Sequence, residues 1–135
     1  MNAKRRGAML KNYSVIVPKD VCPKPSNKEL TAAYVLMEYF KSDVRFIPRN
    51  NCKTPDLMIK RTEWELKAPV GNGKRNMQHT ISRALKQSRH IIVDIRFSKA
   101  SSEKIKNQLI AEVKKNRRIK KLLLIDKKGK VVEIL

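Results

Sequence analysis

Apolar residues follow two spacings along this chain, and together the spacings predict ten elements of regular structure. Strands are expected where apolar and β-branched residues alternate or run together, and helices where apolar residues recur every three to four positions. The predicted strands are residues 13–17, 44–47, 56–60, 63–67, 90–97, 121–126 and 131–135. Helices are predicted from Ser26, over residues 74–88, and from Ser101 or Ser102. Because helices and strands alternate after the second helix begins, we expect an α/β fold with a central mixed sheet flanked by helices.

Local signals support the first helix and one central strand. Ser26 and Glu29 have the spacing of a capping box, in which each side chain bonds the backbone amide of the other residue. The run Ile91-Ile92-Val93 is apolar without interruption, which is typical of a strand covered on both faces. The sequence therefore predicts that this strand lies inside the sheet.

The strands predicted at 56–60 and 63–67 are close enough in sequence to form a hairpin. With residues 61–62 as a two-residue turn, the large apolar side chains of both strands meet on one face, since successive side chains point to opposite faces. The expected opposed pairs are Leu57 with Leu66 and Ile59 with Trp64. Residues 61–62 lack the glycine or asparagine that such a turn prefers.

The same register gathers charged side chains on the other face of the hairpin. It sets Asp56 opposite Lys67 and Met58 opposite Glu65, with cross-strand and diagonal neighbours about 5–8 Å apart. Two carboxylates at that distance can share a divalent cation, for which we expect Mg²⁺ first and Mn²⁺ or Zn²⁺ as alternatives. Lys67 can then orient water or stabilise charge on a phosphate. An ordinary cross-strand ion pair remains the alternative, and Glu63 shares this face and can replace Glu65.

Charge narrows the choice of partner. The 135 residues include 32 Lys and Arg against 12 Asp and Glu, a net charge of +20. Folding does not require such a field, whereas a polyanionic partner tolerates it. Nucleic acid is the first candidate, an anionic membrane surface the second and an acidic protein the third.

Length and cysteine content limit the organisation of the chain. We expect a basic N-terminal extension with a strand over residues 1–20 and one domain over residues 21–135. No apolar run is long enough to span a membrane, and the basic start of the chain lacks the apolar stretch of a signal peptide. Cys22 and Cys52 are too few for a disulfide framework, so reduced thiols and a cytosolic place of action are expected.

Pro55-Asp56, followed nine positions later by Glu65-Leu66-Lys67, resembles the PD-(D/E)xK signature of restriction-endonuclease-like nucleases. The shared core of that superfamily runs α, β, β, β, α, β, which corresponds to residues 27–97. A wider pattern resembles the C-terminal transfer RNA nuclease domain of CdiA contact-dependent growth inhibition toxins. That pattern comprises the Ser-Asn-Lys-Glu helix start, Trp64 to Pro69, the Gly-Asn-Gly loop, and Gln87 before His90-Ile91-Ile92-Val93-Asp94.

The resemblance implies a metal-dependent endoribonuclease that cleaves transfer RNA. It implies that the chain is delivered as part of a larger toxin, acts in the cytoplasm of a target cell, and has a cognate immunity protein, whose surface we expect to be acidic. It also implies that Glu29 adds a third acid to Asp56 and Glu65, as a catalytic group and a metal ligand, with Lys67 completing the centre. For Glu29 the capping role is an equal alternative.

Basic and polar residues around this centre are candidates for contacts with RNA. The loop before the second helix and one side of that helix are expected to hold phosphate near the cleaved bond, whereas the later basic run is expected to track the substrate backbone. The candidates are Lys74, Arg75, Thr80, Arg83, Gln87, Lys114, Lys115, Arg117, Arg118 and Lys121. A plain turn and a solvated helix end are the alternatives, and His79 is either a surface residue or an acid–base group of a metal-free ribonuclease.

Two other functions stay open on the sequence alone. The superfamily core also occurs in DNA nucleases of the Holliday-junction-resolving type, and the signature does not separate RNA from DNA. A non-catalytic nucleic-acid-binding module would carry the same charge. Tyr34, Tyr39, Phe40 and Trp64 are expected to be committed to packing, which disfavours recognition of single strands by base stacking and favours a folded substrate.

Overall fold

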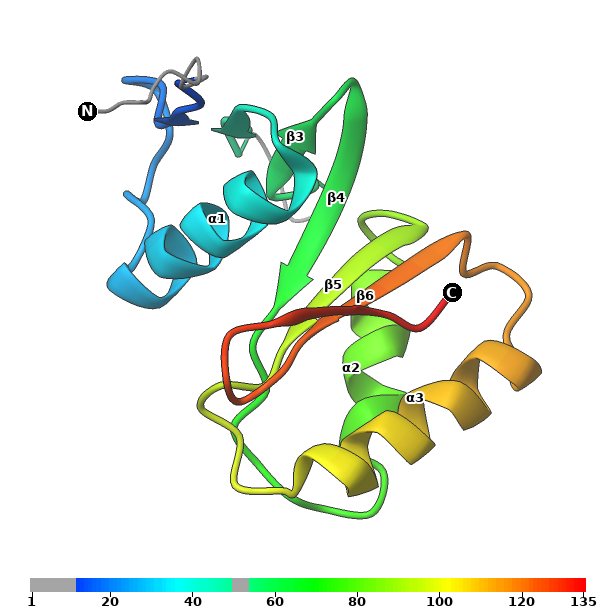
Figure 1. Cartoon of the computed structure of the whole chain (residues 1–135). Helices are drawn as coiled ribbons and strands as arrows, with labels where there is room; N and C mark the ends of the chain where they lie inside the picture. Colours follow the sequence, from blue (N-terminus) through cyan, green and yellow to red (C-terminus); the bar gives the residue numbers. More distant parts are fainter. Residues whose placement is uncertain (1–11, 50–53) are drawn as a thin grey trace.

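The computed structural model describes residues 12–49 and 54–135, and its elements follow one another in the predicted order (Figure 1). Every predicted strand and helix is present, although most are shorter than the apolar patterns suggest. The elements are β1 (Val15–Ile16), α1 (Asn27–Phe40), β2 (Val44–Phe46), β3 (Leu57–Ile59), β4 (Thr62–Lys67), α2 (Asn76–Ala84), β5 (His90–Asp94), α3 (Ser102–Lys115), β6 (Lys121–Ile125) and β7 (Val131–Glu133).

Among the described residues, the strands form one sheet of seven in sequential order. Three of the neighbouring pairs are parallel, β1–β2, β4–β5 and β5–β6, and each of these is joined through a helix. The remaining pairs are antiparallel. The prediction of a mixed sheet flanked by helices is therefore confirmed, because the parallel pairs need crossover helices and the antiparallel ones do not.

The helices divide between the two faces of the sheet, as Figure 1 shows for α1 on one side and α2 with α3 on the other. The first core packs α1 against β2, β3 and β4, with Leu36, Phe46 and Trp64 buried in it. The second core joins α2 and α3 to the opposite face. Ile92 belongs to the first core and Ile91 to the second. The expectation of a strand covered on both faces is thus confirmed for β5.

The hairpin turn differs from the prediction. Lys60 and Arg61 form the turn, with φ angles of 49° and 68°, and Leu57 pairs with Trp64. The prediction of a turn at residues 61–62 is therefore wrong, and the strand register that it implied is wrong as well. Because the pairing changes by an even number of residues and the side-chain period of a strand is two, the side chains that share a face are unchanged. The predicted apolar face therefore forms and is buried in the first core.

Polar caps define where the long helices begin. The Ser26 backbone N–H donates to Glu29 Oε1 at 2.9 Å, and the Glu29 N–H donates to Ser26 Oγ at 3.2 Å, which confirms the capping box. Ser101 caps α3 by accepting from the Lys104 N–H. By contrast, α2 begins later than predicted, and Arg75 at its N-cap provides no side-chain hydrogen bond.

Cysteine, membrane and aromatic predictions have separate outcomes. Cys22 is exposed and unpaired among the described residues, while Cys52 lies outside them. Within the same residues, no helix has the length and apolar character that a membrane crossing requires. The expectation that Tyr34 and Tyr39 are committed to packing is wrong, since they are 54% and 44% exposed, whereas Trp64 is buried.

Candidate active site

Asp56 occupies a fixed position immediately before β3. Its backbone N–H donates to the Trp64 carbonyl at 3.1 Å, and its own carbonyl accepts from the Ile47 N–H at 2.9 Å. The Asp56 carboxylate also accepts from the Leu66 N–H at 2.9 Å, in a buried position. The side chain is therefore held against β4 by the backbone of that strand, and little freedom is left to it.

Glu65 and Lys67 extend from the same face of β4. Lys67 Nζ lies 3.1 Å from Glu65 Oε2, and Glu65 is only 4% exposed. Burial raises the pKa of Glu65 from 4.5 to about 7, with the nearby negative charge of Asp56 acting in the same direction and Lys67 in the opposite one. Glu65 can therefore change its protonation state near neutral pH.

Asp56 lies beside Glu65 rather than opposite Lys67, so the predicted cross-strand pair of Asp56 with Lys67 is wrong. The reason is the position of the turn, since a turn that lies earlier in the chain changes every opposed pair of the hairpin. Lys67 instead pairs with Glu65 of its own strand. The expectation that the three side chains gather on one face does hold, because each keeps its side of the sheet.

Arg49 connects Glu29 to this cluster. Its Nη2 lies 3.0 Å from Glu29 Oε2 and 3.2 Å from Asp56 Oδ1. Glu29 thus serves the capping box with one oxygen and Arg49 with the other. Sequence reasoning did not single out Arg49, because no local motif marks an arginine whose partners are 20 and seven positions away in the chain.

A divalent cation fits part of this cluster. Glu65 Oε1 is buried without a hydrogen-bond donor among the described residues, and Asp56 raises the pKa of Glu65 both by its charge and by a side-chain hydrogen bond that requires a proton between the two carboxyl groups. A shared proton relieves the repulsion between two adjacent carboxyl groups, and a hard cation can take the place of that proton. Glu29 does not join this pair, since Arg49 stands between Glu29 and Asp56. Within residues 12–49 and 54–135, no three Asp, Glu, His or Cys side chains form a group that could hold a metal ion.

The α2 face borders the cluster. Lys67, Thr80 and Arg83 line a cavity of about 190 Å³ together with Ala68 and Pro69. Thr80 is buried, and its Oγ1 has no hydrogen-bond partner among the described residues. Arg83 is exposed at the same cavity. The structure therefore brings two of the predicted RNA contacts, Thr80 and Arg83, beside Lys67.

The loop before α2 is ordered by its own contacts. Asn76 Nδ2 donates to the Gly71 carbonyl at 3.0 Å, and Lys104 Nζ donates to the Asn72 carbonyl at 3.0 Å. Lys74 and Arg75 are exposed at the start of the helix. Their role as phosphate contacts stays a prediction, as does that of His79, which is exposed on α2.

The later basic run lies at the other end of the parallel strands. His90 pairs with Lys121, and this pair marks the beginning of β5 and β6, whereas Lys67 lies at the end of β4 beside Val93. Two members of the run have acidic partners, Lys115 with Glu112 at 3.1 Å and Lys121 with Glu133 at 3.5 Å. These residues are therefore separated from the carboxylate cluster by the length of a strand. The other residues of this basic run are exposed to solvent, namely Lys114, Arg117 and Arg118.

A buried ion pair that the sequence did not indicate anchors α1 to the sheet. Arg96 binds the Asp94 carboxylate through Nε and Nη2, at 2.9 and 2.8 Å. The same guanidinium donates to the Lys28 carbonyl and to Thr31 Oγ1. This pair holds the first turn of α1, and with it Glu29, at the end of β5.

The fold and the site together define a class of protein, a mixed α/β domain in which one β-hairpin of a strongly basic chain carries two adjacent buried carboxylates and a lysine. A sequence profile of the contact-dependent growth inhibition CdiA C-terminal domain matches residues 53–131, more than half of the chain. The chain belongs to this family. Asp56, Glu65 and Lys67 lie inside the matched residues, whereas Glu29 and Arg49 precede them.

A solved structure shares the fold. It is described as the CdiA-CT/CdiI toxin and immunity complex from Burkholderia pseudomallei, and it aligns with a TM-score of 0.61 over 90% of this chain and 98% of that chain. The two sequences are 23% identical over the alignment, so the likeness is one of fold. No curated protein matches this sequence.

Proposed function

We propose that this domain is a metal-dependent endoribonuclease that cleaves transfer RNA and acts as a growth-inhibition toxin. The observation that carries the proposal is the arrangement of Glu65 and Lys67 on β4 with Asp56 from the start of the neighbouring β3, next to Thr80 and Arg83 of α2. A restriction-endonuclease-like nuclease core would use a hairpin between two helices in this way. The net charge of +20 supplies the attraction that an RNA substrate requires.

Each side chain of the site has a chemical task in this reaction. Arg83 and the Thr80 hydroxyl would hold the phosphate, because both line the cavity beside Lys67. Lys67 would stabilise negative charge that develops on that phosphate in the transition state. Glu65 would act as a carboxylate that binds the cation, which would in turn lower the pKa of a bound water as the attacking group. Asp56 would supply the second carboxylate of the centre beside Glu65.

Asp56 and Glu65 would hold the divalent cation. A cation at this position would polarise the phosphate and remove the repulsion between the two carboxylates. The burial of Glu65 beside Asp56 supports this assignment, since two adjacent buried carboxylates are costly when no cation or proton lies between them. Glu29 would approach the cation only after Arg49 has moved, which makes Glu29 a conditional third ligand.

A toxin of this kind endangers the cell that makes it, so we propose a cognate immunity protein as its partner. The family match and the likeness to a toxin and immunity complex support this. A protein that covers a surface as basic as this one is expected to present acidic residues.

The test compares Asp56→Asn and Glu65→Gln with Glu38→Gln, which makes the same chemical change at an exposed position of α1. The first two variants should cleave total transfer RNA about 10²- to 10⁴-fold more slowly than the native chain. Their affinity for RNA should stay within a few-fold, because the charge of the surface survives. Glu38→Gln should cleave normally, and EDTA should stop cleavage by all active forms.

The same assay separates the alternatives. If the protein cleaves plasmid DNA and leaves RNA intact, the proposal would be replaced by that of a DNA nuclease. If the protein binds both RNA and plasmid DNA but cleaves neither with any divalent metal, the nuclease proposal would be replaced by a nucleic-acid-binding module. Rapid cleavage by Glu65→Gln would remove Glu65 from the centre, and EDTA-resistant cleavage would remove the metal.

A further inference from the structure

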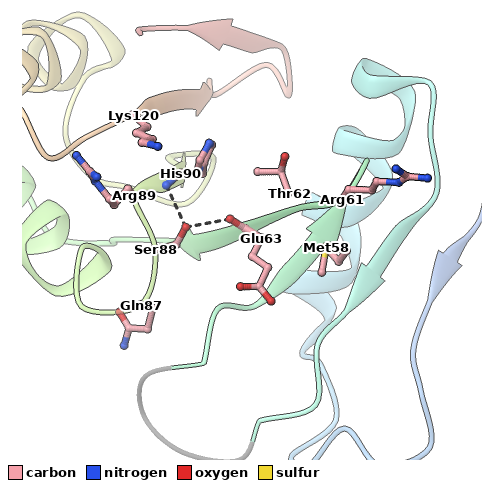
Figure 2. A pocket seen from close by; sticks show the side chains of 9 residues that line it. All are labelled: Met58, Arg61, Thr62, Glu63, Gln87, Ser88, Arg89, His90 and Lys120. Atoms are coloured by element: carbon pink, nitrogen blue, oxygen red, sulfur yellow. Dashed lines mark hydrogen bonds between the residues drawn. The ribbon is translucent and has the colours of Figure 1, made fainter.

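A second cavity lies beyond the carboxylate cluster, at the beginning of β4. It has a volume of about 560 Å³ and opens between the β3–β4 hairpin and the start of β5 (Figure 2). The hairpin extends past the first β4–β5 pair, which joins Glu65 to Ile91, so the strands diverge there and leave a hollow. The Ser88 hydroxyl spans the divergence by donating to the Glu63 carbonyl at 2.9 Å.

Three positive side chains, with one acidic side chain, Glu63, line this hollow. Arg61 lies on the hairpin side in Figure 2, and Arg89 and Lys120 lie on the other side. All three are exposed, and none has a carboxylate partner among the described residues. Arg89 is held in place because its Nε donates to the Arg118 carbonyl. Burial above all, and then the nearby charges of Lys120, Arg89 and Lys121, lower the pKa of His90 below its usual value; the contribution of the three charges agrees with a positive potential at the hollow.

The hairpin turn presents its charge at a conformational cost. Lys60 and Arg61 both have positive φ angles, 49° and 68°, and a two-residue turn of this kind prefers asparagine followed by glycine. Residues with a Cβ are strained in this region. Packing does not explain the choice, since both side chains are exposed. The sequence thus places two cations where uncharged residues would fold better, and a role outside folding accounts for this.

The hollow continues the face that carries the candidate active site. Glu63 lines it and shares one face of β4 with Glu65 and Lys67. From Glu63 to Lys67 the strand rises about 13 Å. Gln87, which lies beyond the end of α2, lines the hollow four positions after Arg83. An RNA strand lying along β4 would cover this distance with a few nucleotides.

We propose that the hollow is a second RNA-binding subsite, in which Arg61, Arg89 and Lys120 hold backbone phosphates of the strand whose cleaved bond lies at Lys67. The assignment rests on the proposed nuclease function for the identity of the ligand. It is separate from the cleavage centre in its residues, and none of the three cations touches the carboxylate cluster. The subsite would fix the register of the substrate without taking part in the chemistry.

The experiment measures binding of RNA to Asp56→Asn protein, which keeps the surface and prevents cleavage. Arg61→Gly and Lys120→Gln are added to this background, singly and together. The first probe is an unstructured RNA that is long enough to span both sites. The second is an RNA dinucleotide that fills only the cleavage site. The double change should weaken binding of the long RNA about fivefold to tenfold and reduce the salt slope by about 0.7 for each phosphate that is no longer neutralised. Binding of the dinucleotide should be unchanged.

Arg61→Gly separates a binding role from a structural one. Glycine adopts the left-handed turn without strain, so this variant should melt a few degrees higher while it binds the long RNA less tightly. A residue that served only the fold would show the opposite stability change. The matched control is Lys106→Gln with Lys130→Gln, which removes the same charge from exposed positions outside the hollow.

The outcomes decide the subsite and the nuclease function independently. Unchanged binding of the long RNA, or an equal loss of affinity in the Lys106 and Lys130 control, overturns the subsite even if the native chain cleaves RNA. A selective loss of immunity-protein binding with intact RNA binding overturns it in favour of a protein-docking surface. If the native chain cleaves no RNA but the Arg61 and Lys120 variants still bind it selectively less well, the subsite stands and the nuclease proposal falls.

Discussion

The two ends of β4 carry charge in opposite ways. At its end, Glu65 and Lys67 are paired with each other, Asp56 is held by a backbone amide, and the cluster is largely buried. At its beginning, Arg61 and Lys120 are exposed and have no carboxylate partner among the described residues. The same strand thus has buried, mutually interacting charges at its end and exposed charges without acidic partners near its beginning.

The difference indicates how each end is expected to respond to change. Buried charges interact through a medium of low effective dielectric constant, so the loss of one partner alters the others strongly. Exposed charges are screened by salt and contribute small, nearly independent amounts. Substitutions at the buried end should therefore change the reaction, and those at the exposed end should change the affinity.

The largest effect at the buried end, apart from the carboxylates themselves, is expected for Arg49. Arg49→Gln removes the cation that bridges Glu29 and Asp56, and cleavage should fall about tenfold to a hundredfold because Asp56 Oδ1, the oxygen that the Leu66 N–H does not hold, loses its cationic partner. The Mg²⁺ concentration that gives half-maximal rate should fall about tenfold, since a competing positive charge has gone. Both quantities come from initial rates measured against metal concentration.

Arg49→Lys is the matched control, because it keeps the charge but not the two-sided contact. It should restore metal affinity to near the native value and activity only in part. A lower rate without any change in metal dependence would show that Arg49 serves the fold alone and does not compete with the cation.

A smaller effect concerns stability and pH. Burial holds the pKa of Glu65 near 7 in the folded chain, against 4.5 when unfolded. Between these values the folded state keeps a proton that the unfolded chain has released, so the free energy of unfolding should decrease as pH rises through this range. Above about 7 the decrease is complete. Urea unfolding in EDTA at several pH values measures it.

Glu65→Gln removes this contribution and should be less sensitive to pH over the same range. His90 acts in the other direction, because its lowered pKa costs stability as pH falls below its ordinary value of 6.5. The comparison of native and Glu65→Gln protein cancels that contribution. Parallel stability curves for the two proteins would contradict a raised pKa at Glu65.

Sequence reasoning reached the fold and the faces of the strands, because both follow from short-range periodicity. The capping box at Ser26 needs four consecutive residues, and the grouping of Glu65 with Lys67 needs only the alternation of a strand. The hairpin register depended on which residues turn, and the residues that do so, Lys60 and Arg61, are poor turn formers. The residue preferences of turns therefore gave the wrong hairpin register, because this turn has positive φ angles at residues that rarely adopt them.

Contacts between distant segments were out of reach. Arg49 meets Glu29 and Asp56 only because β2 and β3 are neighbours and the first turn of α1 lies near them. The hollow near Ser88 exists because two strands diverge, which no residue pattern reports. By contrast, the side of α2 that carries Thr80 and Arg83 followed from helical spacing, and the structure brings both beside Lys67.

The smallest effect is expected at Lys121, which completes the contrast between the two ends. Lys121 lies beside His90 and pairs with Glu133 at 3.5 Å, with both side chains more than half exposed. Lys121→Gln should leave cleavage chemistry and thermal stability unchanged, since exposed ion pairs contribute little. It should weaken RNA binding about twofold to threefold and lower the salt slope by less than about 1. Glu133→Gln, the reciprocal change, should strengthen binding slightly by removing a charge that repels RNA. If Lys121→Gln instead slows single-turnover cleavage of bound RNA, the separation of chemistry from affinity along β4 does not hold.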